Sequence, residues 1–313
     1  MTRAGSMPAP GSVIRIHAPA KVNLALRILD RMEDGFHRLE TLFQAVGLED
    51  VLTLVSVPGD GVELVTRSSQ LGPDRDNLVT RAVHAFRAAT GTATGLRIRL
   101  EKRIPVGAGL GGGSSDAGAT LRALNHLHGR PLPSRRLAEV GSELGADVAF
   151  FTGSAGYALG EGRGERITPL DPLPPRTLLL GLPRVHVATG PAYGALARFR
   201  AEAQGPLPPG ILEAEPPRDW AAVARRAVND FESVVPLASP PVAEALEALR
   251  AAGSPLALLS GSGGAVFGLP WGAEPHLCLS TLRATVPGVR WEAAPTLERL
   301  PEPSEVVPDD RIG

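Results

Sequence analysis

The sequence predicts an α+β protein of two domains. Its 313 residues are about twice the length of a typical domain. Strand-like and helix-like segments are mixed without regular β-α-β alternation, which favours the α+β class. Residues 170–176 contain three prolines, which continue neither a helix nor a central strand, so we expect domains at 13–172 and 173–300. Residues 1–12 are expected to form a disordered tail, and 301–313 a second tail.

The individual elements follow from the spacing of apolar residues. Residues 96–100 alternate as in a strand with one buried face, and 77–90 have helical spacing that stops at Gly91. The other strands are predicted at 13–17 with a second apolar run to 29, and at 50–57, 61–66, 155–159, 165–170, 177–182, 256–259 and 265–269. The other helices are predicted at 115–128, 134–144, 192–200, 219–227 and 241–252.

The composition excludes several classes of protein. With 32 basic and 33 acidic residues, the chain lacks the basic surplus of a general nucleic-acid binder. Its one cysteine, Cys278, excludes an internal disulfide and a multi-cysteine metal site, and we expect a buried thiol there. No apolar run reaches the roughly 18–20 residues that span a bilayer. We therefore expect a cytoplasmic protein that binds neither membrane nor nucleic acid.

Lysine is rare in this chain. It occurs only at Lys21 and Lys102, while arginine supplies the other 30 cations. Where a positive charge alone is needed, the chain uses arginine. A retained lysine therefore indicates a position where a compact ammonium group matters.

A glycine-rich loop at 105–115 carries the strongest chemical signal. Five glycines in residues 107–113 let the backbone approach a ligand closely, and the following helix adds its positive end, which suits a phosphate. The loop lacks the lysine of a Walker loop, and no acidic residue stands where a dinucleotide-binding fold would hold ribose. The alternative is a flexible connection with a serine cap.

Three further segments could contribute to phosphoryl transfer. Lys21, in the small and apolar stretch 18–24, could supply the cation that such a site needs, or be a surface lysine on an edge strand. Asp147 could accept or orient a hydroxyl proton, or cap the next segment. The glycine-serine loop at 260–264 could line a site, or be a hairpin turn.

Together, these segments resemble the superfamily of galactokinase, homoserine kinase, mevalonate kinase and phosphomevalonate kinase, from about residue 16 to residue 300. The discriminating strings are Pro-Ala-Lys-Val-Asn-Leu (19–24), Asp-Gly-Phe-His-Arg-Leu-Glu-Thr-Leu-Phe (34–43), Gly-Leu-Gly-Gly-Gly-Ser-Ser-Asp-Ala (109–117) and Leu-Gly-Ala-Asp-Val (144–148). The resemblance implies an N-terminal domain like domain 2 of ribosomal protein S5 and a ferredoxin-like C-terminal domain. Within the superfamily, the chain most resembles a branch of kinases that phosphorylate the 2-hydroxyl of an alcohol carrying a cytidine diphosphate group. This reaction belongs to the non-mevalonate synthesis of isoprenoid precursors.

The resemblance also implies roles for individual residues. Asp147 would take the hydroxyl proton, and Lys21 would hold that hydroxyl and stabilise developing charge. ATP, with Mg²⁺ near Ser114 or Ser115, would be bound by Asn77 and by Pro105, Val106, Gly107, Ala108, Gly109, Leu110, Gly111, Gly112, Gly113, Ser114 and Ser115. The cytidine-linked substrate would be bound by Asn23, Phe36, His37, Thr189, Tyr193, Ser260, Gly261 and Ser262. Phe36 and Tyr193 would lie on the two sides of cytosine. The protein would be a monomer or a weak homodimer.

Two alternatives to this function remain at this point. One is a superfamily kinase that acts on homoserine or a mevalonate derivative, and the other is a non-catalytic nucleotide-binding module. The presence of both Lys21 and Asp147 argues against a module, because binding alone needs only the glycine cradle. The chain departs from the family in having Phe36 where tyrosine is common and Ser262 where threonine is common. Its proline-rich region 201–218 matches nothing in the family.

Overall fold

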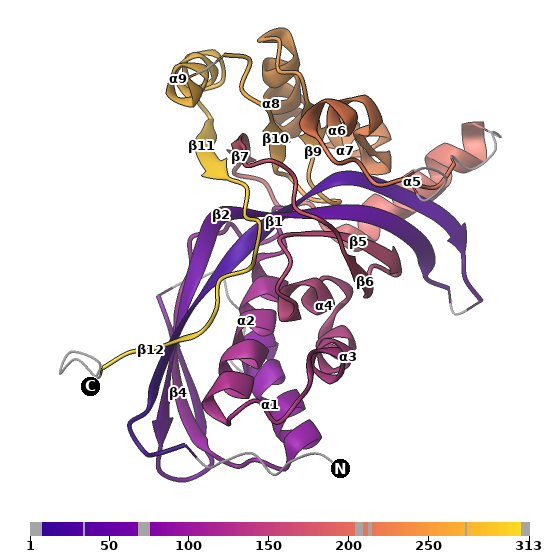
Figure 1. Cartoon of the computed structure of the whole chain (residues 1–313). Coiled ribbons are helices and arrows are strands. Elements are labelled where there is room, and N and C mark those ends of the chain that lie inside the picture. The colour runs from indigo at the N-terminus through magenta and orange to yellow at the C-terminus, as the bar shows by residue number, and fades with distance from the viewer. Residues whose placement is uncertain are drawn as a thin grey trace.

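The computed structural model has two β-sheets, and the long strands β1 and β2 lie between its two halves (Figure 1). The predicted α+β class is confirmed. The structure describes residues 8–33, 35–67, 76–203, 209–211, 215–272 and 274–307. Asp34, the extreme ends of both predicted tails and parts of the region 201–218 lie outside these residues. Across the described ranges, each helix is too short or too polar to span a bilayer.

Within the described residues, eight strands form the first sheet, whose main path runs β12-β1-β2-β4-β3. β1 and β2 pair in antiparallel fashion along most of their length, and β3 pairs in parallel with β4. The two strands on either side of the turn at 58–61 are therefore separated by β4. The strands are β1 (Val13–Arg31), β2 (His37–Val57), β3 (Val62–Thr66), β4 (Gly95–Glu101), β5 (Tyr157–Gly162), β6 (Arg166–Pro169), β8 (Val228–Asn229) and β12 (Ser304–Glu305).

Helices cover one face of this sheet. Buried side chains of β1, β2 and β4 pack against them, with Ile16, Leu52 and Ile98 meeting Phe86 and Leu121 in one apolar cluster. Burying each of these large side chains contributes about 1.5–3 kcal/mol to folding. The helices are α1 (Leu78–Thr90), α2 (Gly112–Leu127), α3 (Ser134–Leu144) and α4 (Ala146–Thr152).

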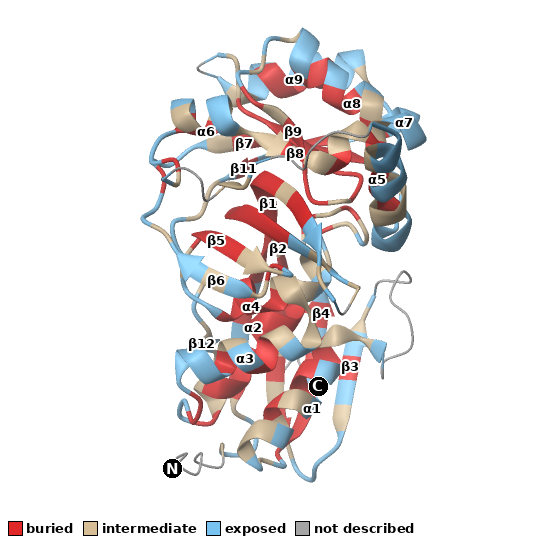
Figure 2. Cartoon of the chain, turned by 90° about the vertical axis from the view of Figure 1, so that its right-hand side faces the viewer, coloured by how far each residue is buried: buried red, intermediate tan, exposed pale blue. Residues whose placement is uncertain are grey.

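Burial changes along β1 because its surroundings change. Near its start, Arg15 and His17 are exposed while their neighbours are buried, since helices cover only one face. Residues 18–26 are all buried, because the second sheet covers the other face (Figure 2). The pairing register with β2 shifts between Pro19 and Ala20, at this transition. The alternating strand and the apolar run predicted from sequence are thus one strand.

The second sheet is antiparallel, with the strand order β11-β7-β10-β9. α8 precedes β9 and α9 follows β10, so that, with the elements inserted before α8 set aside, the chain order is the β-α-β-β-α-β of the predicted ferredoxin-like domain. The expected boundary at 170–176 forms the irregular link between β6 and β7. These elements are β7 (Thr177–Pro183), α8 (Pro240–Ala251), β9 (Ala257–Leu259), β10 (Val266–Gly268), α9 (Pro275–Thr285) and β11 (Val289–Pro295).

Further helices lie between β7 and α8, in addition to β8 of the first sheet. They are α5 (Thr189–Ala203), α6 (Trp220–Arg226), the 3₁₀ helix η3 (Asp230–Ser233) and α7 (Val235–Ala238). Cys278 is buried in α9, in agreement with the buried thiol expected from the sequence.

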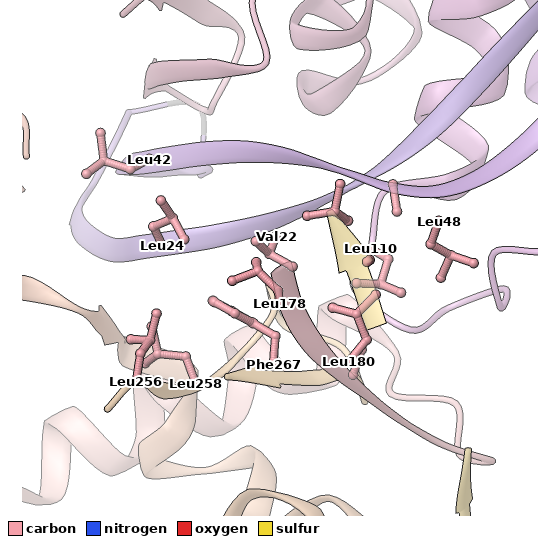
Figure 3. Packing of buried hydrophobic residues seen from close by; sticks show 14 of the residues in the cluster. Val22, Leu24, Leu42, Leu48, Leu110, Leu178, Leu180, Leu256, Leu258 and Phe267 are labelled. Atoms are coloured by element: carbon pink, nitrogen blue, oxygen red, sulfur yellow. The ribbon is translucent and has the colours of Figure 1, made fainter. Parts of the chain in front are cut away.

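Apolar side chains join the two halves of the molecule. Val22 and Leu24 on β1 and Leu42 on β2 pack with Leu178 and Phe267 of the second sheet (Figure 3). The core is therefore continuous across the junction, and the two sheets are held against each other.

Two glycine-rich loops also meet at this junction, backbone against backbone. Gly109 has φ +83°, and a Cβ there would lie 2.1 Å from the carbonyl oxygen of Ser260. A Cβ on Gly263 would lie 2.2 Å from the Gly109 nitrogen, and the Ala265 N–H donates to the Ala108 carbonyl over 2.8 Å. The loop at 260–264 is thus the turn of the β9–β10 hairpin and also the support of the first loop.

The end of the chain returns to the first sheet as a strap, residues 296–305 (yellow in Figure 1). Thr296 bridges to Val46 and Arg299 to Ala155, each in antiparallel fashion. Leu300 packs in the apolar cluster that contains Phe151 of α4. β12, which falls within the tail predicted at 301–313, pairs with β1.

The loop junction makes a prediction about stability. Gly109→Ala should lower the free energy of unfolding by about 3 kcal/mol, because it adds an overpacked contact to a left-handed backbone conformation. Gly59 has φ +86° with nothing within 4 Å of its added Cβ, so Gly59→Ala should cost only about 1 kcal/mol. Urea unfolding of both variants measures the difference, and equal losses would contradict the tight approach.

Candidate active site

A cavity of about 480 Å³ lies where β1, both glycine loops, α4 and α5 come together. Most of the residues singled out from the sequence line it. They are Lys21, Asn23, Asp147, Thr189, Tyr193, Gly261, Ser262 and the whole stretch from Pro105 to Ser114. Segments that are distant in sequence therefore form one site, as the predicted site requires.

Lys21 lines this cavity, and three groups hold its ammonium in place. Its ammonium donates hydrogen bonds to the Asn23 Oδ1 and to the Gly109 carbonyl, both over 2.8 Å. Its Nζ lies 3.5 Å from the Asp147 Oδ2. The Lys21 side chain is only 4% exposed, which excludes the surface lysine of the alternative interpretation.

Asp147 lies in the first turn of α4, and its side chain is 34% exposed. The helix begins after Gly145, and no side chain caps it, so Asp147 is not the cap that the alternative suggested. Phe150 and Phe151, further along α4, are buried, and Phe150 stacks on Phe43 at 5.0 Å. Because these rings anchor the helix, its first turn presents the carboxylate to the cavity.

The first glycine loop enters α2 with its backbone facing the cavity. Gly107, Gly109 and Gly111 all have positive φ, which side-chain-bearing residues rarely adopt. The N-terminal residues of the 16-residue helix α2 line the cavity, so its unpaired N–H groups and positive dipole end are available to an anion. This arrangement, called the phosphate cradle below, is suited to an anion such as a phosphate.

The two serines that follow the glycines have different surroundings. Ser114 lines the cavity. Ser115 is buried, and its hydroxyl donates to the Pro19 carbonyl over 2.7 Å. Of the two serines expected as magnesium contacts, Ser114 therefore lines the cavity and Ser115 does not.

The aromatic rings of Tyr193 and Phe231 also line the cavity. The Tyr193 ring is 5.5 Å from His37 and 4.9 Å from Phe231. Burial, and next the charge of Asp147, raise the pKa of the Tyr193 phenol to about 12, so it stays neutral. Burial, then Arg31 and Arg200, lower the pKa of His37 below its ordinary value. His37, Arg31 and Arg200 line a recess of about 210 Å³, to which Tyr193 also contributes.

Besides Ser115, four of the predicted contacts lie outside the lining of the main cavity. Phe36 is 56% exposed and stacks with the guanidinium of Arg163, which itself lines the cavity, at 4.0 Å. The Asn77 side chain caps α1 by accepting the Val79 N–H. Ser260 is buried, and its hydroxyl donates to the Gly109 carbonyl over 3.1 Å. His37 reaches the site only through Tyr193.

Sequence reasoning missed other residues that shape the site. Arg163, in the β5–β6 turn, lines the cavity. Asn229 donates to the carbonyls of Leu259 and Gly261, both over 2.8 Å, and so fixes the second glycine loop. A single asparagine in a short polar segment and one arginine among 30 carry no pattern that could reveal them.

The residues present are compatible with magnesium delivered by a nucleotide. Among the described residues, no group of three or more His, Cys, Asp or Glu is arranged for a metal ion. The Ser114 hydroxyl beside the phosphate cradle is an oxygen donor of the kind that Mg²⁺ binds together with phosphate oxygens.

Family models match both halves of the chain. The GHMP kinases N terminal domain matches residues 77–154, and the GHMP kinases C terminal domain matches 211–275. The solved structure of homoserine kinase from Cytophaga hutchinsonii has a TM-score of 0.68 at 20% identity, covering 94% of this chain and 97% of that one, and so shares the fold.

Two relatives are closer in sequence. The 4-diphosphocytidyl-2-C-methyl-D-erythritol kinase of Pelotomaculum thermopropionicum is 40% identical over 261 residues, which cover 82% of this chain and 89% of the relative. A crystal structure of 4-(cytidine 5'-diphospho)-2C-methyl-D-erythritol kinase has a TM-score of 0.72 at 36% identity, covering 90% of this chain and 98% of that one. The chain therefore belongs to the GHMP kinases and, within them, to the family of the 4-diphosphocytidyl-2-C-methyl-D-erythritol kinases.

Proposed function

We propose that this ATP-dependent kinase transfers the γ-phosphoryl group of ATP to the 2-hydroxyl of 4-diphosphocytidyl-2-C-methyl-D-erythritol, in the synthesis of isoprenoid precursors. The observation that carries the proposal is the 3.5 Å approach of the Lys21 ammonium to the Asp147 carboxylate in a cavity that also contains a phosphate cradle. The identity to relatives of this name supports the choice of substrate.

The proposed reaction needs a proton acceptor, a cation and a held triphosphate. The substrate hydroxyl oxygen forms a bond to the γ-phosphorus while the bond from that phosphorus to the β–γ bridging oxygen breaks. The hydroxyl proton passes to the Asp147 carboxylate, and ADP leaves. Lys21, fixed by Asn23 and Gly109, orients the hydroxyl and offsets negative charge that develops during transfer.

The triphosphate would lie against the first glycine loop and the start of α2. Backbone N–H groups at this helix end bind phosphate oxygens, and no side chain at Gly111 to Gly113 obstructs them. Mg²⁺ held by the phosphates and Ser114 would neutralise part of the triphosphate charge.

The cytidine diphosphate group would lie toward Tyr193. A tyrosine face stacks on a nucleobase, and the contacts of Tyr193 with Phe231 and His37 hold its ring in place. The exposed Phe36 stacks with Arg163, which lines the cavity, and could approach the ligand from the solvent side. Thr189 and Ser262, joined by a 3.2 Å hydrogen bond, close the wall between α5 and the second loop.

The proposal predicts which alcohol is phosphorylated. Purified protein incubated with ATP, Mg²⁺ and one alcohol at a time should release ADP with 4-diphosphocytidyl-2-C-methyl-D-erythritol, and not with homoserine or mevalonate. Phosphorus NMR of the product should place the new phosphate on the 2-oxygen. ADP release with homoserine or mevalonate instead would identify another superfamily activity, and ATP binding without turnover would indicate a binding module.

Replacing the proposed base should separate binding from chemistry. Asp147→Asn keeps the shape of the side chain but removes its ability to accept a proton, so we expect kcat to fall roughly 10²–10⁴-fold. Affinity for an unreactive ATP analogue should stay near the wild-type value, because the cradle is untouched. Asp60→Asn, in an exposed turn, is the matched control. Wild-type turnover in Asp147→Asn would refute the base role.

Replacing lysine by arginine tests the need for a compact cation. A Cβ on Gly111 would lie 3.1 Å from the Lys21 side chain, so the stem of Lys21 is closely packed. A planar guanidinium cannot satisfy the same three partners in that space. We expect Lys21→Arg to lower kcat by roughly 10² or more. Arg97→Lys, at an exposed ion pair, should have wild-type kcat. Near-normal rates in Lys21→Arg would contradict this account.

A further inference from the structure

The second lysine of the chain is the centre of a buried ion triplet beneath the phosphate cradle. Lys102 donates hydrogen bonds to the carboxylates of Asp50 and Asp116, and the distance to Asp116 is 2.8 Å. The three side chains, in the order Lys102, Asp50 and Asp116, are 7%, 0% and 5% exposed. The proposed mechanism uses none of them.

Asp50 fixes the chain where the loop begins. It lies on β2, and its Oδ1 accepts the backbone N–H groups of Arg103 and Ile104, the latter over 2.9 Å. These residues immediately precede the loop at 105–115. Its other oxygen accepts from Lys102, so this carboxylate joins the loop entry to the first sheet.

Asp116 fixes the chain where the loop ends. It follows Ser115 in α2, and its Oδ2 accepts from Lys102 while its Oδ1 has no hydrogen-bond partner among the described residues. Burial raises the pKa of Asp116 to about 7, against the lowering effect of Lys102. Burial alone lowers the pKa of Lys102, but the two carboxylates outweigh it and raise that pKa. The ammonium therefore stays charged.

The Lys102 ammonium is packed closely against the start of α2. A Cβ on Gly112 would lie 2.9 Å from Ile104 and 3.3 Å from the Lys102 Nζ. Lys102 also lines both the active-site cavity and a hollow of about 1710 Å³ on the outer face of the first sheet. The group thus lies directly behind the start of α2, where the cradle N–H groups are.

We propose that Lys102 is a positioning residue for ATP, which joins the entry and exit of the glycine loop through Asp50 and Asp116. This inference rests on the proposed function, because it assumes that the loop binds the triphosphate. Five glycines make the free loop costly to order. By holding both ends at fixed positions, the ion triplet lowers the entropy that ATP binding must remove.

The test must separate loop positioning from stability. Removing one member of a buried ion group leaves unpaired charge, whereas replacing the whole group by apolar residues is often neutral for stability. We therefore compare Lys102→Met with the triple variant Asp50→Asn/Lys102→Met/Asp116→Leu, in which the amide oxygen introduced at position 50 can still accept the loop N–H groups. Arg97→Met, which removes an exposed ion pair from β4, the strand that ends immediately before Lys102, is the control.

In the triple variant, we expect wild-type stability to urea with affinity for an unreactive ATP analogue lowered roughly tenfold or more. KM for the alcohol should change by less than about twofold, because the residues proposed to bind the alcohol, from Lys21 to Tyr193, are not part of the ion triplet. Amide hydrogen exchange at 105–115 should accelerate in both Lys102 variants and remain at the wild-type rate in Arg97→Met.

A stable triple variant that binds the ATP analogue and exchanges its loop amides as the wild type does would overturn the proposal. Neither readout requires the alcohol. If the wild type fails to phosphorylate the alcohol while the variants still lose analogue affinity, the proposed function fails and the positioning role stands.

Discussion

The carbonyl oxygen of Gly109 is the point at which three distant parts of the chain are joined. It accepts a hydrogen bond from the Lys21 ammonium on β1 and another from the Ser260 hydroxyl of the second glycine loop. One backbone oxygen with two lone pairs thus fixes the first loop against both sheets. Any displacement of the loop would remove one hydrogen bond from the buried Lys21 ammonium and the acceptor of the buried Ser260 hydroxyl, which is costly in an interior of low polarity.

The sequence predicts a helix or strand well where only one of its faces is buried. α1 and β4 begin and end within one or two residues of their predicted limits, because their periodicity is clear. β2 begins at His37, well before the strand predicted at 50–57, since residues 39–46 are buried on both faces and do not alternate. β8 and β12 are two residues each and exist only through pairing with β1, so no local pattern can reveal them.

The same distinction applies to the site. Residue types and glycine spacing predict the cradle and the meeting of Lys21 with Asp147. They do not predict that Ser114 faces the cavity while Ser115 faces Pro19, because adjacent residues of a helix point in different directions. The scarcity of lysine is informative for both lysines: each is buried, and each lies beside an aspartate within a few ångströms of the glycine loop.

The strap at 296–305 has a consequence for the order in which the protein can be completed during synthesis. Leu300 fills the cluster behind α4, and β12 closes the edge of β1 beside it. Both come from residues that are translated after the other strands of the two sheets. The first sheet therefore stays incomplete until those residues have been made and have packed, and α4, which carries Asp147, gains its full support only then.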